Sequence, residues 1–200
     1  MLSQAPNNFF NATRNMLVFT FTETDLLNTP LLPSHHSNAG RISYTLRTKK
    51  GILGRKITTL SASGGHSTHT LLGGAINWRK KRFEIGGVRR KCSGLKHRTG
   101  LFSSSQEWNW SGQHYVIKYS RNQWMATCSS SRDSPSAVFT VRRSHFFRKS
   151  EPATIAFSPD LPQDDVVFLI LVIIFSEMKR KEDEVAVAEA TSNVIGLATN

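Results

Sequence analysis

The longest apolar run in the chain lies at residues 166–175 and reads VVFLILVIIF. Asp164 and Asp165 precede this run, and three basic residues follow it at 179–181. Acidic residues at the start and basic residues at the end favour a helix, because the peptide dipoles leave partial positive charge at its N-terminus and negative charge at its C-terminus. A helix that is apolar on every side must be buried on every side, in protein or in lipid.

The run is short for a membrane span. Crossing a bilayer takes about 20 apolar residues, because the hydrocarbon core is ~30 Å thick and each helical residue rises ~1.5 Å. The run covers only about 15 Å by this rule, and extending it to Met178 brings in Ser176 and Glu177. We therefore expect no transmembrane span, and a helix over residues 162–180 that the protein itself encloses. Its predicted core residues are Val166, Val167, Phe168, Leu169, Ile170, Leu171, Val172, Ile173, Ile174 and Phe175.

The chain before this helix is patterned as short β-strands. Leu17, Phe19 and Phe21 fall on alternate positions, and Ser111-Gly112 between two strand-like segments is a hairpin signal. Strands are predicted at residues 17–22, 26–32, 41–48, 56–61, 71–78, 82–85, 88–92, 107–110, 113–119, 122–127, 137–142 and 153–157, with polar loops at 62–70, 93–105 and 129–136. A barrel would enclose the helix. The pattern therefore predicts a mainly β fold, a closed antiparallel barrel of about twelve strands around a buried C-terminal hydrophobic helix.

A length of 200 residues suits a single domain with tails. We expect a disordered N-terminal tail at residues 1–15, a barrel at 16–184 and a C-terminal tail at 185–200. The helix is expected to continue beyond the core as an exposed, charged extension to about Ala190, with a frayed end after it. The N-terminus has no basic segment followed by an apolar one, so no secretory signal is predicted and a cytoplasmic location is expected.

Positive charge is concentrated in the strand-rich part of the chain. Residues 1–159 hold 23 Lys and Arg against 6 Asp and Glu, a net charge of +17, whereas residues 160–200 hold 3 against 8, a net charge of −5. Such a body attracts anionic surfaces, either nucleic acid or phospholipid headgroups. An incidental excess of Lys and Arg gives the same composition, so charge alone leaves the partner open.

Two groups of basic residues are candidate anion-binding sites. The first comprises Arg79, Lys80, Lys81 and Arg82 with Arg89, Arg90 and Lys91, which cluster at the ends of a hairpin if residues 82–92 form one. The second comprises Arg142, Arg143, Arg148 and Lys149, with Phe146 and Phe147 between them. Arg contacts phosphate through two parallel hydrogen bonds, and Lys supplies a point charge. Either group is also consistent with a solvated turn, and the aromatic rings with ordinary core packing.

No catalytic or metal-binding pattern is present. His66-x-x-His69 has no Cys or carboxylate companion nearby, and Cys92 and Cys128 lack the spacing of zinc ligands. Trp78, Trp108, Trp110 and Trp124 are expected to pack in the core of the barrel rather than to form a platform for a ligand. The chain contains no nucleophile-elbow, phosphate-loop or HExxH motif. We expect a protein without catalytic residues, metal or cofactor.

Five segments together resemble an uncharacterised fungal domain family similar to the tubby C-terminal, LURP-one and phospholipid scramblase group. They are LVFTFTETDLLNTPLL at 17–32, YTLRTKKGILGRKITTL at 44–60, AINWRKKRFEIGG at 75–87, GLFSSSQEWNWSGQHYVIKY at 100–119 and VVFLILVIIFSEMKRKEDE at 166–184. The resemblance implies an antiparallel barrel of about twelve strands around a central C-terminal helix. Tubby-type domains bind phosphoinositides through basic residues, but those positions have no individual match in this sequence.

Three hypotheses for function follow. The first is a non-enzymatic, tubby-like module at the membrane periphery that binds an anionic phospholipid surface or phosphoinositide through basic strand ends. The second is a nucleic-acid-binding barrel, which the same positive charge and the aromatic residues between the basic ones also support. The third is a structural or protein-interaction module in which the charge is incidental. The oligomeric state is left open.

Overall fold

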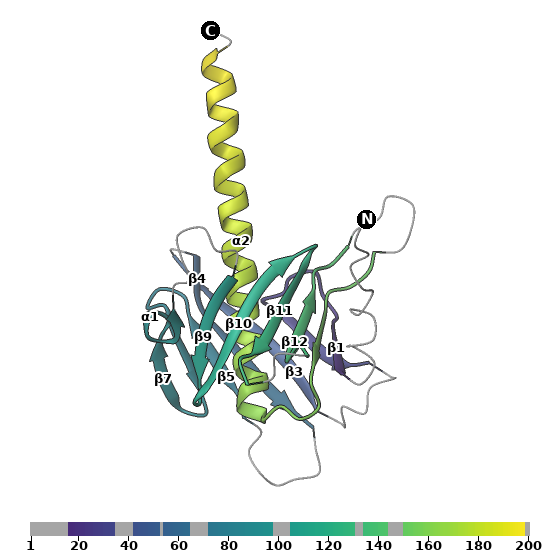
Figure 1. Cartoon of the computed structure of the whole chain (residues 1–200). Coiled ribbons are helices and arrows are strands. Elements are labelled where there is room, and N and C mark those ends of the chain that lie inside the picture. Colours follow the sequence, from purple (N-terminus) through teal and green to yellow (C-terminus); the bar gives the residue numbers. More distant parts are fainter. Residues whose placement is uncertain are drawn as a thin grey trace, which may run out of the picture.

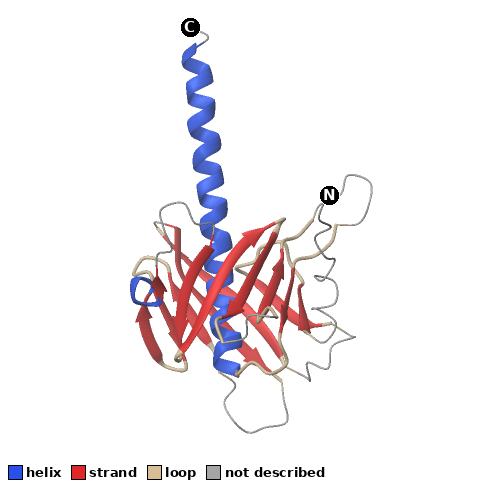
Figure 2. Ribbon diagram, in the orientation of Figure 1, coloured by secondary structure: helices blue, strands red, loops and turns tan. Residues whose placement is uncertain are grey.

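The structure is a computed structural model that describes residues 16–34, 42–52, 54–64, 72–97, 105–130, 134–143 and 150–198, with side chains described to residue 191. Within these residues the chain forms a mainly β fold of thirteen antiparallel strands and two helices. Figures 1 and 2 show the strands wrapped around one long helix, which projects from one end of the sheet. The N-terminal tail predicted at residues 1–15 lies outside the described residues.

The strands follow one another in the sheet almost as they do in the sequence. The first seven are β1 (Leu17–Phe21), β2 (Thr29–Pro33), β3 (Ser43–Gly51), β4 (Gly54–Ser63), β5 (Gly74–Asn77), β6 (Arg82–Ile85) and β7 (Val88–Lys91). After α1 (Cys92–Leu95) come β8 (Lys96–His97), β9 (Ser105–Trp110), β10 (Gln113–Ser120), β11 (Gln123–Cys128), β12 (Ala137–Thr140), β13 (Thr154–Phe157) and α2 (Gln163–Ala198). The sheet order is β7-β6-β5-β4-β3-β2-β1-β13-β12-β11-β10-β9-β8. Pairing of β1 with β13 therefore joins the two halves of the chain.

The predicted buried helix is confirmed. Every side chain of α2 from residue 167 to residue 174 is 0% exposed. Strands far apart in the sheet supply the covering rings: the Phe168 ring centroid lies 5.3 Å from that of Trp110 in β9 and 6.5 Å from that of Phe83 in β6. The predicted core tryptophans Trp108, Trp110 and Trp124 are buried, and Trp78 is half-buried. An alternating strand pattern thus provides the enclosure that an all-apolar helix requires.

Gly74 marks the closest approach of the sheet to the helix. A Cβ atom at this position would lie 2.7 Å from Leu171 Cδ1 and 2.9 Å from Val167 Cγ1. We expect Gly74→Ala to lower the free energy of unfolding by about 1–3 kcal/mol, because the packed helix has no room to retreat. Urea denaturation followed by Trp fluorescence measures this loss. Gly94→Ala is the matched control, since nothing lies within 4 Å of its added methyl, and an equal loss in both variants would contradict the close packing.

The sheet ends at two edge strands, β7 and β8. No hydrogen-bonded ladder joins these two strands in the described part of the chain, and α1, which contacts β7, β8 and β9, lies between them. The expected antiparallel sheet and enclosed helix are therefore present, with thirteen strands rather than about twelve, but the ladder of hydrogen bonds does not close into a barrel.

The prediction of a polar loop at residues 93–105 is wrong in part. The helix α1 covers the beginning of this segment, and its residues Cys92 and Leu95 are buried. The two-residue strand β8 is too short to show a sequence period.

The helix runs further than expected. It continues to Ala198 rather than to about Ala190. Ala and Glu, which are good helix formers, recur between Asp183 and Ala190, but the sequence TSNVIGLA at residues 191–198 gives no such reason for the last two turns. Neither described helix has a stretch long and apolar enough to cross a bilayer. The side chains of α2 from residue 183 to residue 191 are exposed, including Val185 and Val187.

Candidate functional site

The helix defines two ends of the wrapped sheet. It begins beside β3, where the Gln163 side-chain amide donates a hydrogen bond to the Tyr44 hydroxyl at 2.7 Å. It leaves the sheet beside Trp78 and Tyr119, and we call this second end the exit end (Figure 1). The antiparallel register places the β3–β4, β5–β6 and β10–β11 turns and the last residue of β7 at the exit end.

The β5–β6 turn carries four consecutive basic residues at the exit end. Asn77 Oδ1 accepts a hydrogen bond from the Lys80 backbone N–H at 3.0 Å, and the Cys92 N–H donates to the Lys81 carbonyl at 2.8 Å. Lys81 takes a left-handed conformation, with φ 47°. The turn is therefore fixed in place, and it presents four exposed side chains: Arg79, Lys80, Lys81 and Arg82.

The predicted hairpin at residues 82–92 is confirmed as β6 and β7. Its register sets Arg82 directly opposite Lys91, and Arg89 opposite Glu84. Arg89 is neutralised, because its Nε lies 2.8 Å from Glu84 Oε2, and this contact raises the pKa of Arg89. Arg82 and Lys91 have no such partner among the described acids. Like charges directly opposite each other in a sheet are destabilising. The repulsion between Arg82 and Lys91 therefore lowers the stability of the folded protein at the exit end.

A third basic segment, missed as a site in the sequence, lies beside these two. The β3–β4 hairpin reads KKGILGRK at residues 49–56, and Lys49, Lys50 and Lys56 are exposed. The Trp78 backbone N–H donates to the Lys56 carbonyl at 3.2 Å, so the two turns are direct neighbours. Ile52, at the tip, is fully exposed. An apolar tip between two basic pairs is a local signal that could have identified this hairpin.

These residues form one surface, which we call the basic rim. It comprises Lys49, Lys50, Lys56, Arg79, Lys80, Lys81, Arg82 and Lys91. Within the described residues, none of these side chains forms an ion pair with an acid. The nearby acid Glu182 is already bound to Arg55 and Lys179. The rim therefore concentrates positive charge that the protein itself leaves unneutralised.

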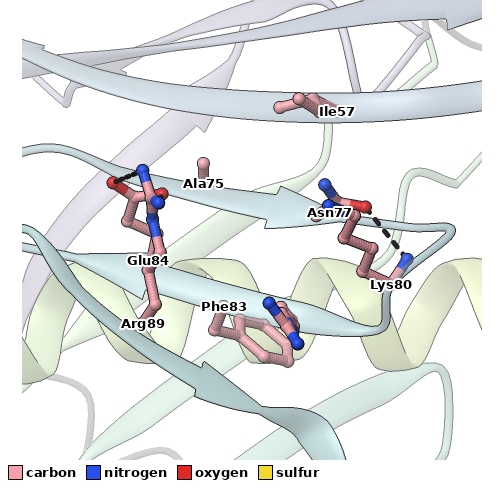
Figure 3. A pocket seen from close by; sticks show the side chains of 8 residues that line it. Ile57, Ala75, Asn77, Lys80, Phe83, Glu84 and Arg89 are labelled. Carbon is pink, nitrogen blue, oxygen red and sulfur yellow. Dashed lines mark hydrogen bonds and ion pairs between the residues drawn. The ribbon is translucent and has the colours of Figure 1, made fainter.

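A depression of about 230 Å³ opens on the outer face of the sheet, directly beside the rim. Figure 3 shows Lys80 and Asn77 at one end of it, and the Glu84–Arg89 pair at the other. Ile57, Ala75 and Arg82 also line it. With two unpaired cations and a side-chain amide at one end, the depression has the donors to hold a phosphate group.

The second predicted basic group is brought to the same end but not to the same place. Arg142 and Arg143 follow β12, several strands away from β6 in the sheet order, and both are exposed. The backbone of Arg143 exchanges two hydrogen bonds with that of Glu151, at 3.2 and 2.9 Å. Arg148, Lys149, Phe146 and Phe147 lie outside the described residues. Arg90 points elsewhere, as described below.

The rim is tied to the helix where α2 leaves the sheet. The Trp78 ring stacks on Phe175 with centroids 5.5 Å apart, and the Arg55 guanidinium carbon lies 4.5 Å from the centroid of the Trp78 ring. Arg55 also pairs with Glu182 of α2. Trp78 Nε1 donates to Thr58 Oγ1 at 2.7 Å. The basic turns are therefore held on a rigid base, as a recognition surface requires.

Among the described residues, Glu177 is the one carboxylate of the exit end that is fully buried. It accepts hydrogen bonds from Trp124 Nε1 at 2.9 Å and from Arg180 Nε at 2.8 Å. Burial raises the pKa of Glu177, but the bonds from Arg180 and Trp124 outweigh it, and the pKa lies below its usual value. Arg180 in turn lies 4.6 Å over the Tyr119 ring. This network holds the helix in the sheet.

The described residues include no cluster of three or more His, Cys, Asp or Glu side chains that could hold a metal ion. His66 and His69 lie outside the described residues. Cys92 and Cys128 are free and buried, and burial raises the pKa of the Cys92 thiol. No family model, curated protein or solved structure matches the chain.

Proposed function

We propose that the chain is a non-enzymatic binding module, a tubby-like barrel whose basic rim binds anionic phospholipid headgroups, with phosphoinositides as the preferred class. The observation that carries the proposal is the pair Arg82 and Lys91, which stand opposite each other without a described acid between them. A bound phosphate would neutralise both, and so convert a repulsive pair into an attractive site. The depression beside Lys80 and Arg82 offers room for one such group.

The position of the helix decides how a membrane would meet the rim. About 20 residues of α2 extend beyond the exit end, roughly 30 Å at ~1.5 Å per residue. A flat membrane facing that end would meet the helix first. We therefore place the membrane against the outer side of the rim, on β3 to β7, where the depression opens (Figure 3). The fully exposed Ile52 would then lie at headgroup depth.

A lipid surface explains the site better than a nucleic acid does. Single-stranded nucleic acid is bound by stacking bases on exposed aromatic rings. Trp108, Trp110 and Trp124 are buried in the core, and Trp78 is half-buried with its ring in contact with Arg55 and Phe175. The described rim therefore offers cations and one apolar tip, but no open ring for a base.

Charge reversal on the rim tests the proposal. Liposome co-sedimentation at low salt compares phosphatidylcholine vesicles with vesicles that also contain a phosphoinositide. We expect Lys80→Glu with Lys81→Glu to weaken binding to the anionic vesicles by about 10- to 100-fold, because each basic residue near such a surface contributes roughly fivefold and the new carboxylates are repelled.

The matched control is Lys118→Glu with Arg121→Glu on the β10–β11 hairpin. It makes the same change in net charge, and Lys81 and Arg121 share a positive φ, of 47° and 51°. Equal weakening in both variants would show that binding depends on total charge alone. Failure of the unaltered protein to bind either vesicle would remove the proposal, and binding of a single-stranded RNA in its place would favour the nucleic-acid alternative.

A further inference from the structure

The gap between the two edge strands is a groove. Because β8 has only two residues, the end of β9 faces β7 without a full strand between them. A cavity of about 400 Å³ fills this position, lined by Arg90 of β7, Leu95 of α1, and Asn109 and Trp110 of β9. We call it the seam. It is distinct from the depression beside the basic rim, with which it shares no lining residue.

The inner face of β7 is uncovered at the seam. Phe83 and Ile85 of β6 point into the core and are each 1% exposed. Their cross-strand partners Arg90 and Val88 lie on that same face of the sheet. Val88 is nevertheless 48% exposed, and Arg90 is also exposed. An inward-facing Val with half its surface in water indicates that one layer is missing at this edge.

The backbone of β7 is also open there. Gly86 and Gly87, with φ 55° and 80°, form a two-residue turn that bonds Val88 to Ile85. Bonded and non-bonded pairs alternate along an antiparallel ladder, so Arg90 bonds to β6, whereas the N–H and C=O groups of Arg89 and the N–H group of Lys91 face the seam. The C=O of Lys91 is not free, because Lys91 is the N-cap of α1 and its carbonyl accepts the first hydrogen bond of that helix. Among the turn and loop hydrogen bonds of the described residues, none uses the outward groups of Arg89 or the N–H of Lys91.

We propose that the seam is a docking site for an acidic peptide segment of a partner protein, which binds as an added strand on β7. Alternating donors and acceptors along an edge are satisfied together only by another extended chain. Trp110 lines the seam, and its indole N–H is buried without an acceptor among the described residues.

Charge selects the occupant. Arg89, Arg90 and Lys91 are consecutive on the edge, so two copies of β7 repel each other and do not pair. Arg89 is bound to Glu84, which leaves Arg90 and Lys91 to attract carboxylates on the incoming strand. The same residues that prevent self-association therefore favour an acidic partner.

A labelled eight-residue peptide that alternates glutamate with threonine tests the proposal by fluorescence anisotropy. We expect Arg90→Glu to weaken its binding by about tenfold or more, whereas Lys80→Glu, an equal charge change on the rim, leaves it within about twofold. Vesicle binding by the same two variants should show the opposite order, so the seam and the rim are tested separately.

Hydrogen exchange provides the readout for an added strand. In the free protein the amides of Arg89 and Lys91 should exchange fast and that of Arg90 slowly, and the peptide should slow the first two. A peptide N-methylated at alternate residues keeps its charge but loses the edge bonds, and should bind about tenfold more weakly. Equal binding of both peptides, or no binding of either, would overturn the proposal.

Discussion

Leu169→Asp is expected to leave the chain unfolded. Leu169 lies in the middle of the buried part of α2 and is 0% exposed. Removal of its side chain from a packed core alone costs about 2–5 kcal/mol, and an unpaired carboxylate in the same place costs several more. The sum is comparable to the whole stability of a typical domain, about 5–15 kcal/mol. The measurement is the near-UV circular dichroism of the purified variant, together with its yield in the soluble fraction.

Val187→Asp is the matched control, because it makes a similar change in the same helix where the side chain is 66% exposed. We expect it to fold as the unaltered protein does. The two variants also separate burial in the sheet from anchoring in lipid. A folded Leu169→Asp protein that has merely left the membrane fraction would mean that the helix does not pack inside the sheet.

Most of the fold can be predicted from the sequence, because two patterns dominate it: one continuous apolar run and the alternation of apolar and polar residues in the strands. An apolar run without a polar face requires enclosure, and the alternation at Phe19 and Phe21 supplies sheet to enclose it. Glu177 is harder to place, because a carboxylate after an apolar run suggests the surface. Its burial depends on Trp124, which is 53 residues away in the sequence, and local patterns carry no information about such a contact.

The candidate site is only half visible for the same reason. Residues 79–82 form a run of four basic residues, so they can be identified as a candidate site from the sequence alone. Lys49, Lys50 and Lys56 join them only because β4 pairs with β5, and register between distant hairpins cannot be derived from spacing. The seam is invisible in the sequence, because it arises where α1 replaces a strand. A short segment such as Cys92–Leu95 has too few residues to show either period.

Glu177→Ala is expected to lower the free energy of unfolding by about 3 kcal/mol, because it breaks a buried ion pair by removing one partner. The substitution leaves Trp124 Nε1 without its acceptor and Arg180 without the carboxylate that both Nε and Nη2 contact. Urea denaturation at neutral pH measures the loss. Glu189→Ala, an exposed change on the same helix, should leave stability within about 0.5 kcal/mol.

The pH dependence distinguishes the charge of Glu177 from its size. Its pKa is lowered in the folded state, since the bonds from Arg180 and Trp124 outweigh the opposing effect of burial. The ionised carboxylate therefore stabilises the fold fully above its unfolded pKa of about 4.3, and this contribution is lost as the pH falls through the lower folded-state value. Glu177→Gln keeps an acceptor for Trp124 but never ionises. The gap in stability between the unaltered protein and Glu177→Gln should thus be widest near neutral pH and narrow in acid, and a gap that stays constant with pH would assign the role of Glu177 to packing alone.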